Sequence, residues 1–450
     1  MNTRSRPVIR LSDVIQNAVT GRRFLGSFQS FPKSNSKGTK NYKAGRESKL
    51  MGKPLRSKVR NSYADMLGSK GSLVGHSILR GQTLRRSFLY VPAHSERFIN
   101  KALTSTADCI VLDLEDGVAE SQKNTARDNI RNLLHRLADE GYRPGENKGA
   151  ELCLRINNEG WLRESSWRRE GTENIVAPTD TLDKDLELLG LPQGFRLTVV
   201  VPKANNPVNL RYISNAVMVK RLQHTSYEEA IAHRLNMIPI IETPHGVMNI
   251  AKYASFGGWF SGMVFAAEDY CASLGIPRTE DYSNMLFARS SIVNLCKMMG
   301  LSTIDMVCQD FKRPDVLLEE CNDGLYHGFE GKQTIHPDQI DIINKAFSPR
   351  PSEVQWARDL LHEVEKRPED GAFEFNGKMV DRPVFRKAEN ILARCKKIIE
   401  FEEARFQTEE AIEAAKEVKE DKVFIEGVES ASQETHDQSV TAEGRRGYGK

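Results

Sequence analysis

The fold is decided by the stretch Cys109–Gly117, which reads Cys-Ile-Val-Leu-Asp-Leu-Glu-Asp-Gly. Its first four residues are apolar and favour a strand that is buried on both faces, as in a parallel sheet. Three carboxylates, Asp113, Glu115 and Asp116, then crowd the end of this strand. Like charges repel and are costly to bury without a cation or hydrogen-bond donors. This strand end is therefore either the start of a helix, whose dipole favours acids, or part of a functional site.

The charge of the chain is divided unevenly. Residues 1–80 contain 17 Lys and Arg and three acidic residues, whereas the rest of the chain contains 47 basic and 58 acidic residues. An acidic body with a basic leader is not typical of a nucleic-acid-binding domain, which concentrates positive charge on its folded part. No apolar run approaches the roughly 18–20 residues of a membrane-spanning helix. We therefore expect neither nucleic acid nor a membrane as a partner.

The composition predicts four parts along the chain. Residues 1–82 are rich in Arg, Lys, Ser, Gly and Asn, and resemble an organellar transit peptide more than a secretory signal. We expect import into the mitochondrial matrix; the alternative is a disordered basic tail. Residues 83–348 are expected to form the catalytic domain and residues 349–405 a C-terminal extension. Residues 406–450 are charged and nearly free of large apolar side chains, which predicts a disordered tail.

From residue 83 on, eight apolar runs alternate with helix-like segments, which is the signature of βα units. The runs are Phe88–Val91, Cys109–Leu114, Leu152–Ile156, Leu197–Val201, Met237–Ile241, Met263–Ala267, Thr303–Val307 and Lys332–Ile335. Eight such strands in about 250 residues predict an α/β fold, the (β/α)8 TIM barrel. An open doubly wound sheet is the alternative, but it would more often carry a glycine-rich phosphate loop after its first strand. This chain has Pro92-Ala93-His94-Ser95 there.

The C-terminal extension is predicted to be α-β-α. Ser352–Lys366 and Val384–Arg405 repeat apolar residues at helical spacing. Between them, Gly371–Met379 is typical of a small hairpin, with Asn376-Gly377 as a type I′ turn. We expect this extension to pack on the barrel or on a neighbouring subunit.

In a TIM barrel the chemistry lies at the C-terminal ends of the strands, and here seven successive strand ends are ionisable. They are Asp113, Glu115 and Asp116, then Arg155, Lys203, Glu242, Glu268 and Asp269, Asp305, and His336. Acids predominate, and the seven cysteines of the chain form no CxxC pair. This donor set favours a hard divalent cation, Mg²⁺ or Mn²⁺, over Zn²⁺. Glu242 and one of Glu268 and Asp269 are the best candidates for its ligands.

The two cationic strand ends, Arg155 and Lys203, are the candidate anion binders. Lys203 leaves a second mechanism open, because a desolvated lysine can form a Schiff base with a carbonyl substrate. We favour the alternative that Lys203 pairs with the surplus carboxylates. His336 and Asp305 are expected to be structural.

Several motifs resemble those of the citrate lyase β-subunit-like family, which belongs to the wider HpcH/HpaI aldolase group. In chain order they are Arg86–Pro92, Leu112–Val118, Leu154–Asn157, Val201–Lys203, Ile241–Gly246, Ala267–Tyr270, Ala288–Ser290, Ile304–Asp305, Gly331–Pro337 and Gly377–Pro383. The resemblance covers about residues 85–400 and is collinear throughout.

The resemblance implies a Mg²⁺-dependent barrel enzyme that cleaves or forms a carbon–carbon bond next to a CoA thioester. Under this resemblance Glu242 and Asp269 ligate Mg²⁺, Arg155 grips the substrate carboxylate, and Glu115 and Asp116 organise metal waters and the CoA end. Tyr90, Arg97 and Lys101 match positions that contact CoA, Gln333 and Thr334 border it, and Asp381 matches the acid/base aspartate on the extension. Members of this family are typically trimers or hexamers in which the extension completes a neighbour's site.

The expected function is cleavage of (3S)-citramalyl-CoA, or of malyl-CoA, into a 2-oxo acid and acetyl-CoA, with malate synthase or thioesterase chemistry as a side activity. Two alternatives remain. One is a Mg²⁺-dependent aldolase that acts on free 2-oxo acids, which would not need Arg97, Lys101 or Asp381. The other is a non-catalytic subunit that has kept the barrel.

Overall fold

The computed structural model of the protein describes residues 83–140, 149–158, 180–190, 197–222 and 237–405. The predicted leader and tail, residues 1–82 and 406–450, lie outside the described residues. Within the described ranges no helix is long and apolar enough to cross a membrane.

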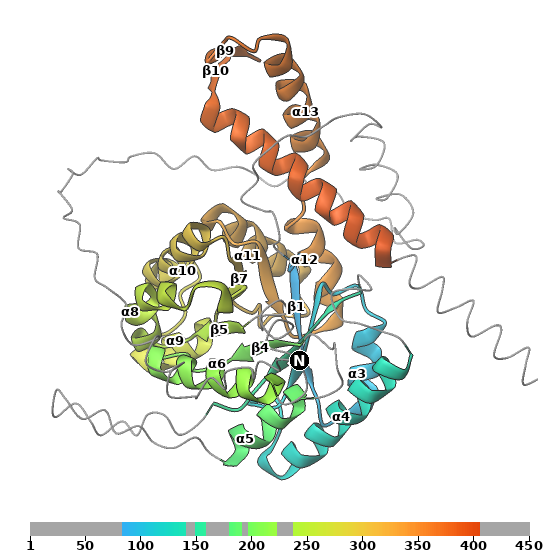
Figure 1. Cartoon of the computed structure of the whole chain (residues 1–450). Coiled ribbons are helices and arrows are strands. Elements are labelled where there is room, and N and C mark those ends of the chain that lie inside the picture. The colour runs from blue at the N-terminus through green and yellow to red at the C-terminus, as the bar shows by residue number, and fades with distance from the viewer. Residues whose placement is uncertain (1–82, 141–148, 159–179, 191–196, 223–236, 406–450) are drawn as a thin grey trace, which may run out of the picture. The chain divides into compact units, whose positions relative to one another are not determined.

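Eight parallel strands close into a barrel in chain order, with the last strand paired to the first (Figure 1). The strands are β1 Ser87–Pro92, β2 Cys109–Asp113, β3 Glu151–Arg155, β4 Thr198–Val201, β5 Met237–Ile241, β6 Gly262–Phe265, β7 Ser302–Asp305 and β8 Gly331–Thr334. Each overlaps one of the eight predicted runs. The predicted (β/α)8 barrel is therefore confirmed.

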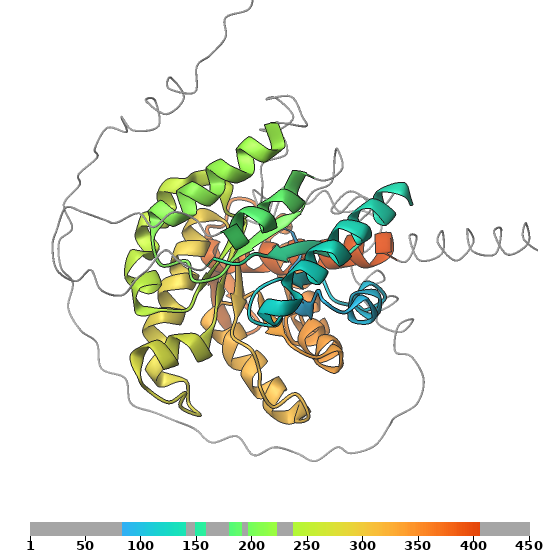
Figure 2. The ribbon, with the colours of Figure 1, turned by 90° about the horizontal axis from the view of Figure 1, so that it is seen from below.

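Helices follow the strands and surround the barrel, as the view along its axis shows (Figure 2). The α-helices are α3 Glu96–Leu103, α4 Lys123–Asp139, α5 Asp180–Glu187, α6 Pro207–Leu222, α8 Pro244–Tyr253, α9 Ala267–Leu274, α10 Leu286–Met299, α11 Pro314–His327 and α12 Ile340–Ala346. Short 3₁₀ helices are η1 Glu120–Gln122, η2 Leu188–Gly190, η3 Ala254–Trp259, η4 Ser283–Met285 and η5 Pro337–Gln339.

The strands are buried on both faces, which explains their nearly continuous apolar sequences. One set of side chains fills the barrel interior, namely Phe88, Cys109, Val111, Cys153, Val200, Ile238, Ile240, Val264 and Ile304. The alternate set packs outward against the helices in a larger apolar cluster. A barrel filled in this way is a rigid support, and the loops at its C-terminal end carry the polar residues.

The C-terminal extension has the predicted α-β-α order. Helix α13, Pro351–Lys366, leads into the antiparallel pair β9, Ala372–Phe375, and β10, Lys378–Asp381, and a helix over residues 382–405 follows. The turn residues Asn376 and Gly377 have φ angles of 50° and 72°, as a type I′ turn requires.

Two arginines join this extension to the barrel. Arg86 at the start of β1 forms a buried pair with Asp108, at 2.9 Å, and reaches Glu402 of the last helix, at 3.2 Å. Arg394 in the same helix donates to the carbonyl oxygens of Phe347 and Glu330, at 2.9 and 2.8 Å. The extension is therefore anchored to the barrel through its last helix.

Candidate active site

A cavity of about 290 Å³ lies at the C-terminal end of the barrel strands. It is lined by Tyr90, Pro92, Asp113, Gly117, Arg155, Ile240, Glu242, Ala266, Ala267, Glu268, Asp269, Val307, Gln333 and Ile335. These residues come from β1, β2, β3, β5, β8 and the segments that follow the strands. The lining combines charged residues, such as Arg155, Glu242 and Asp269, with apolar ones, such as Ile240 and Val307, which suits a small organic acid.

Two charged residues of the lining, Asp113 and Arg155, are the last residues of β2 and β3 and form a pair. Nε and Nη2 of Arg155 donate to the two carboxylate oxygens of Asp113, each at 2.6 Å. The same carboxylate accepts the main-chain N–H groups of Glu115, at 2.9 Å, and Gly117, at 3.0 Å. A Cβ at position 117 would lie 2.3 Å from Asp113 Oδ2, so only glycine fits this turn. The pair fixes the guanidinium above the ring of Tyr90, 4.8 Å from its centre.

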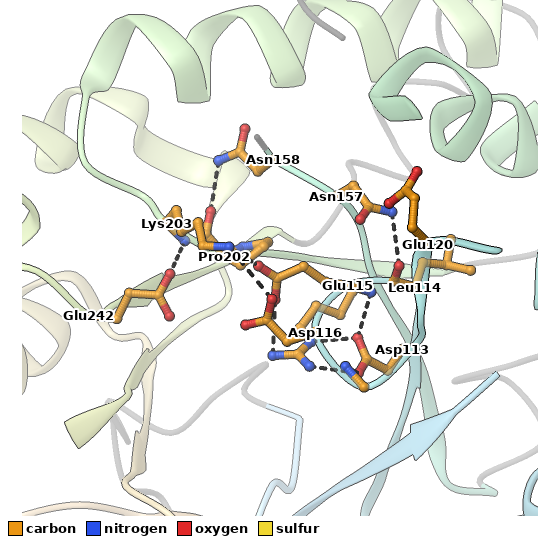
Figure 3. Close-up of polar contacts among 12 residues, drawn as sticks. Asp113, Leu114, Glu115, Asp116, Glu120, Asn157, Asn158, Pro202, Lys203 and Glu242 are labelled. Carbon is orange, nitrogen blue, oxygen red and sulfur yellow. Dashed lines mark hydrogen bonds and ion pairs between the residues drawn. The ribbon is translucent and has the colours of Figure 1, made fainter. Parts of the chain in front are cut away.

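Glu115 connects this pair to Lys203 (Figure 3). Nζ of Lys203 lies 2.6 Å from Oε1 of Glu115 and 3.7 Å from Oδ1 of Asp116, and Nη1 of Arg155 lies 3.2 Å from Oε2 of Glu115. Burial opposes the charged form of Lys203, but the hydrogen bond and negative charge of Glu115 outweigh it and raise the pKa of the ammonium. The prediction that Lys203 pairs with the carboxylates is confirmed.

The backbone of Lys203 is in the left-handed region, with φ 51°. This conformation is uncommon for a residue with a side chain and persists where neighbours hold it. Asn158 donates to the carbonyl oxygen of Pro202, at 2.7 Å, and the N–H of Asn205 donates to the carbonyl oxygen of Lys203, at 2.8 Å. In this conformation the N–H of Lys203 donates to Oε1 of Glu242 (Figure 3).

Glu242 follows β5 and is buried, with an exposed fraction of 5%. Burial, together with the negative charges of Glu115 and Asp269, raises the pKa of Glu242 to about 8. Apart from the N–H of Lys203, its carboxylate has no hydrogen-bond or ion-pair partner among the described residues. When Glu242 is ionised, its negative charge is therefore not neutralised by an ion pair with any described residue.

The structure distinguishes the two acids that follow β6. Oε1 of Glu268 lies 2.7 Å from Nη1 of Arg278, so that its charge is neutralised by an ion pair. Asp269 lines the cavity and makes no hydrogen bond or ion pair with any described residue. Partial burial and the charge of Asp116 raise the pKa of Asp269. Asp269, and not Glu268, is therefore the second carboxylate that is open to a cation.

Glu242 and Asp269 fit a hard divalent cation. Both present carboxylate oxygens to the same cavity, and burial and neighbouring negative charges raise the pKa of each. A cation between the two carboxylates would relieve this repulsion. The described residues contain no cluster of three or more His, Cys, Asp or Glu side chains arranged around one point. Two carboxylates completed by water and substrate oxygens are a usual Mg²⁺ site.

Tyr90 and Gln333 lie inside the barrel and line the same cavity. Tyr90 packs edge-on against Phe88, with ring centres 5.7 Å apart, and its hydroxyl has no hydrogen-bond partner in the described part of the chain. Gln333 donates to the carbonyl oxygen of Phe265, at 2.8 Å. Thr334 is fully buried and is not among the lining residues.

The remaining predicted site residues lie outside the cavity lining. Arg97 and Lys101 are exposed on α3, and Asp116 is exposed beside Lys203. Asp381 is exposed at the end of β10. Within a single chain, therefore, the described cavity does not include the predicted acid/base residue.

Asp305 and His336, which were expected to be structural, both contact other parts of the protein in a supporting role. Asp305 lies 2.7 Å from the fully buried Arg289. His336 accepts the N–H of Asp338, at 3.2 Å, and stacks on Phe311 with ring centres 5.0 Å apart.

Sequence reasoning missed the asparagines that fix the loops. Nδ2 of Asn157 donates to the carbonyl oxygen of Leu114, at 2.9 Å, and Asn158 holds Pro202 (Figure 3). They tie the loops after β2 and β4 to the end of β3. The only signal was their position two and three residues after Arg155, the last residue of a strand.

A barrel with a carboxylate pair at its mouth, beside a paired arginine, defines the class of the protein. Residues 86–337 match the model of the HpcH/HpaI aldolase/citrate lyase family, and the chain belongs to this family of carbon–carbon lyases.

Individual relatives agree with this assignment. The chain is 33% identical over 318 residues to the mitochondrial citramalyl-CoA lyase of Mus musculus, covering 68% of this chain and 85% of the relative. It is 28% identical over 319 residues to the (3S)-malyl-CoA thioesterase of Cereibacter sphaeroides, covering 70% and 96%. Among solved structures, the protein CitE of Mycobacterium tuberculosis in complex with magnesium, acetoacetate and coenzyme A is 30% identical, with a TM-score of 0.52, covering 70% of this chain and 98% of that one.

Proposed function

We propose that this protein is a Mg²⁺-dependent lyase that cleaves the carbon–carbon bond of a 3-hydroxyacyl-CoA thioester. The first candidate substrate is (3S)-citramalyl-CoA, which would give pyruvate and acetyl-CoA, and the second is malyl-CoA, which would give glyoxylate and acetyl-CoA. The observation that carries the proposal is that Glu242 and Asp269 form no ion pair with any described residue, on a cavity that also presents Arg155. The substrates named for the mouse and Cereibacter relatives support the CoA thioester.

The proposal gives a role to the charged residues in and beside the cavity. A Mg²⁺ ion held by Glu242 and Asp269 would polarise the carboxylate and hydroxyl oxygens of the substrate as a Lewis acid. Arg155 has five N–H donors, of which two are hydrogen-bonded to Asp113, so that others remain for the substrate carboxylate. Glu115 holds Arg155 and Lys203 in place, and the exposed Asp116 is available to metal-bound water.

Cleavage is a retro-Claisen step. The substrate hydroxyl gives its proton to an acid/base group at the site, and its carbon–oxygen bond becomes the carbonyl of the 2-oxo acid. The electrons of the broken carbon–carbon bond form the enolate of acetyl-CoA, which then takes up one proton. We assign that proton to Asp381. In the synthetic direction Asp381 would remove it from the methyl group of acetyl-CoA.

Asp381 is exposed on the hairpin of the extension and is not a lining residue of the cavity of its own chain. We therefore infer that the hairpin of a neighbouring subunit supplies it, in a homotrimer or homohexamer. The exposed cations Arg97 and Lys101 on α3 would face the phosphates of CoA. Gln333 lines the cavity and would border the CoA moiety, whereas the buried Thr334 would support it from behind.

An acetyl-CoA release assay tests this function. Citramalyl-CoA and malyl-CoA are supplied in parallel to the purified protein, with Mg²⁺ and with EDTA, and to the Asp381→Asn variant. Mg²⁺-dependent release that is lost in the variant supports the lyase, and the ratio of the two rates identifies the substrate. No release from either thioester by a folded protein that binds Mg²⁺ would exclude it and favour an aldolase for free 2-oxo acids; absence of Mg²⁺ binding as well would favour a non-catalytic subunit.

We further infer that residues 1–82 direct the protein to the mitochondrial matrix. The inference is supported by their basic, nearly acid-free composition and by the mitochondrial location in the name of the mouse relative. Fusion of residues 1–82 to a fluorescent protein should place the reporter in mitochondria. Diffuse cytosolic fluorescence would contradict the inference.

A further inference from the structure

The segment that carries Asp269 begins without the usual support. Asp269 lies in the first turn of α9, and the residue that precedes this helix, Ala266, has no side chain that could cap it. Helix starts are ordinarily stabilised by Ser, Thr, Asp or Asn at that position. The position of this turn, which presents Asp269 to the cavity, therefore depends on contacts other than a side-chain cap.

Arg278, four residues beyond the end of α9, supplies that contact. Its Nη1 lies 2.7 Å from Oε1 of Glu268, the neighbour of Asp269, and donates to the carbonyl oxygen of Val307, at 3.0 Å. Glu268 and Val307 both line the cavity. One guanidinium group thus joins the first turn of α9 to the segment that follows β7.

The other terminal nitrogen of the Arg278 guanidinium group, Nη2, faces the interior of the protein. Nη2 lies 2.7 Å from Oε1 of Glu320 on α11, and Oε2 of Glu320 lies 2.8 Å from Nζ of Lys332 on β8. Lys332 is fully buried and Glu320 is nearly so, whereas the Arg278 side chain is 15% exposed. The ring of Tyr282 lies 5.5 Å from the guanidinium and shields it further. The chain of charges therefore runs from the cavity wall to a barrel strand.

We propose that Arg278 is a positioning residue for the metal ligand Asp269, acting through Glu268. The inference rests on the proposed function, in which Glu242 and Asp269 hold Mg²⁺. Glu268, paired with Arg278, anchors the helical turn that carries Asp269. Outer partners of this kind orient the ligands of a metal, and their loss typically weakens metal affinity about 10–100-fold.

The direction in which metal affinity changes when Arg278 is replaced distinguishes a positioning role from a purely electrostatic one. Arg278 is a cation close to a cation site, so that by Coulomb's law alone its removal should tighten the binding of a divalent ion. Loss of positioning should weaken the binding instead. Weaker binding of the metal ion after removal of this positive charge would therefore show that Arg278 acts by positioning Asp269.

The experiment measures the binding of Mn²⁺, as a spectroscopic probe for Mg²⁺, by electron paramagnetic resonance in the absence of substrate. Arg278→Gln is expected to raise the dissociation constant about 10-fold, and Arg278→Lys by a smaller factor, because one ammonium cannot reach Glu268, Val307 and Glu320 together. Arg313→Gln is the charge-matched control. Arg313 pairs with Asp315 on the surface, at 2.7 Å, and should leave the affinity unchanged.

Unchanged or tighter Mn²⁺ binding by folded Arg278→Gln would overturn the proposal. If that variant does not fold, Arg278→Lys decides in the same way. Glu242→Gln separates this inference from the proposed function. Loss of Mn²⁺ binding in Glu242→Gln but not in the Arg278 variants refutes only the role of Arg278, whereas a wild-type protein that binds no Mn²⁺ refutes both.

Discussion

Nζ of Lys203 lies 2.6 Å from Oε1 of Glu115, across the mouth of the barrel from β4 to the loop after β2. The pairing raises the pKa of the lysine, so that it is an ammonium ion at neutral pH. An ammonium ion has no free electron pair with which to attack a carbonyl group. The lysine-dependent aldolase mechanism, which the sequence left open, therefore does not suit this site.

Sodium borohydride tests this conclusion, because it reduces a Schiff base to a stable secondary amine. We expect that incubation with pyruvate and borohydride leaves the mass of the peptide containing Lys203 unchanged and does not inactivate the protein. A lysine-dependent aldolase serves as the positive control. A pyruvate-derived mass increase on Lys203 would show that the ion pair opens during the reaction.

The pair between Asp113 and Arg155 should contribute strongly to stability. Asp113 is 2% exposed, and Asp113→Asn would leave the guanidinium of Arg155 with a neutral partner in a nearly buried site. Breaking a buried pair in this way costs about 3–5 kcal/mol of unfolding free energy. Urea denaturation would measure it.

Asp128→Asn is the matched control, since Asp128 pairs with Arg131 on the surface at 2.6 Å, with side chains 65% and 41% exposed. Surface pairs contribute about 1 kcal/mol or less. Equal losses in the two variants would contradict the importance given to the buried pair.

Gly117 is expected to be important for both stability and substrate binding. The Cβ of alanine would lie 2.3 Å from Oδ2 of Asp113 and 3.7 Å from Pro92, so that the Asp113 carboxylate must move. We expect Gly117→Ala to lose about 1–3 kcal/mol of stability, as is usual for overpacking, and to weaken substrate binding through Arg155. Gly371→Ala should do neither, because among the described residues nothing beyond its two chain neighbours lies within 4 Å of the added Cβ.

The stability of the metal-free protein should fall as pH rises. The pKa of Glu242 is about 8 in the folded protein and about 4.5 in the unfolded chain. Between these values the folded state holds a proton that the unfolded state has lost, so that stability decreases with rising pH through this window and stays low above it. The effect of one such group is on the order of a few kcal/mol.

Thermal unfolding of EDTA-treated protein from pH 5 to pH 9 would measure this loss. Glu242→Gln should flatten the profile relative to wild type, and Mg²⁺ should restore stability most strongly at high pH, where the carboxylate is ionised. Parallel profiles for wild type and Glu242→Gln would show that the Glu242 charge is compensated by another group.

The sequence was sufficient for the architecture because the signals of a parallel barrel are local. Strands buried on both faces have continuous apolar sequences, as in Cys109–Leu112, and each ends at a polar residue such as Asp113 or Arg155. The type I′ turn at Asn376-Gly377 follows in the same way from residues that tolerate positive φ. Asp113 was recognised as part of a charged cluster but received no specific role.

What the sequence by itself determined is the eight-stranded barrel, its C-terminal hairpin and the acidic strand ends. Only the tertiary structure decided which of these acids remain available. Glu268 and Asp269 are adjacent and chemically similar, yet Arg278 neutralises Glu268, whereas Asp269 has no ion-pair partner among the described residues. Likewise, the tertiary structure brings the ammonium group of Lys203 next to Glu115, and the left-handed backbone of Lys203 directs its N–H to Glu242. Pairing between charges depends on separation in space, which residues distant in sequence acquire only when the barrel closes.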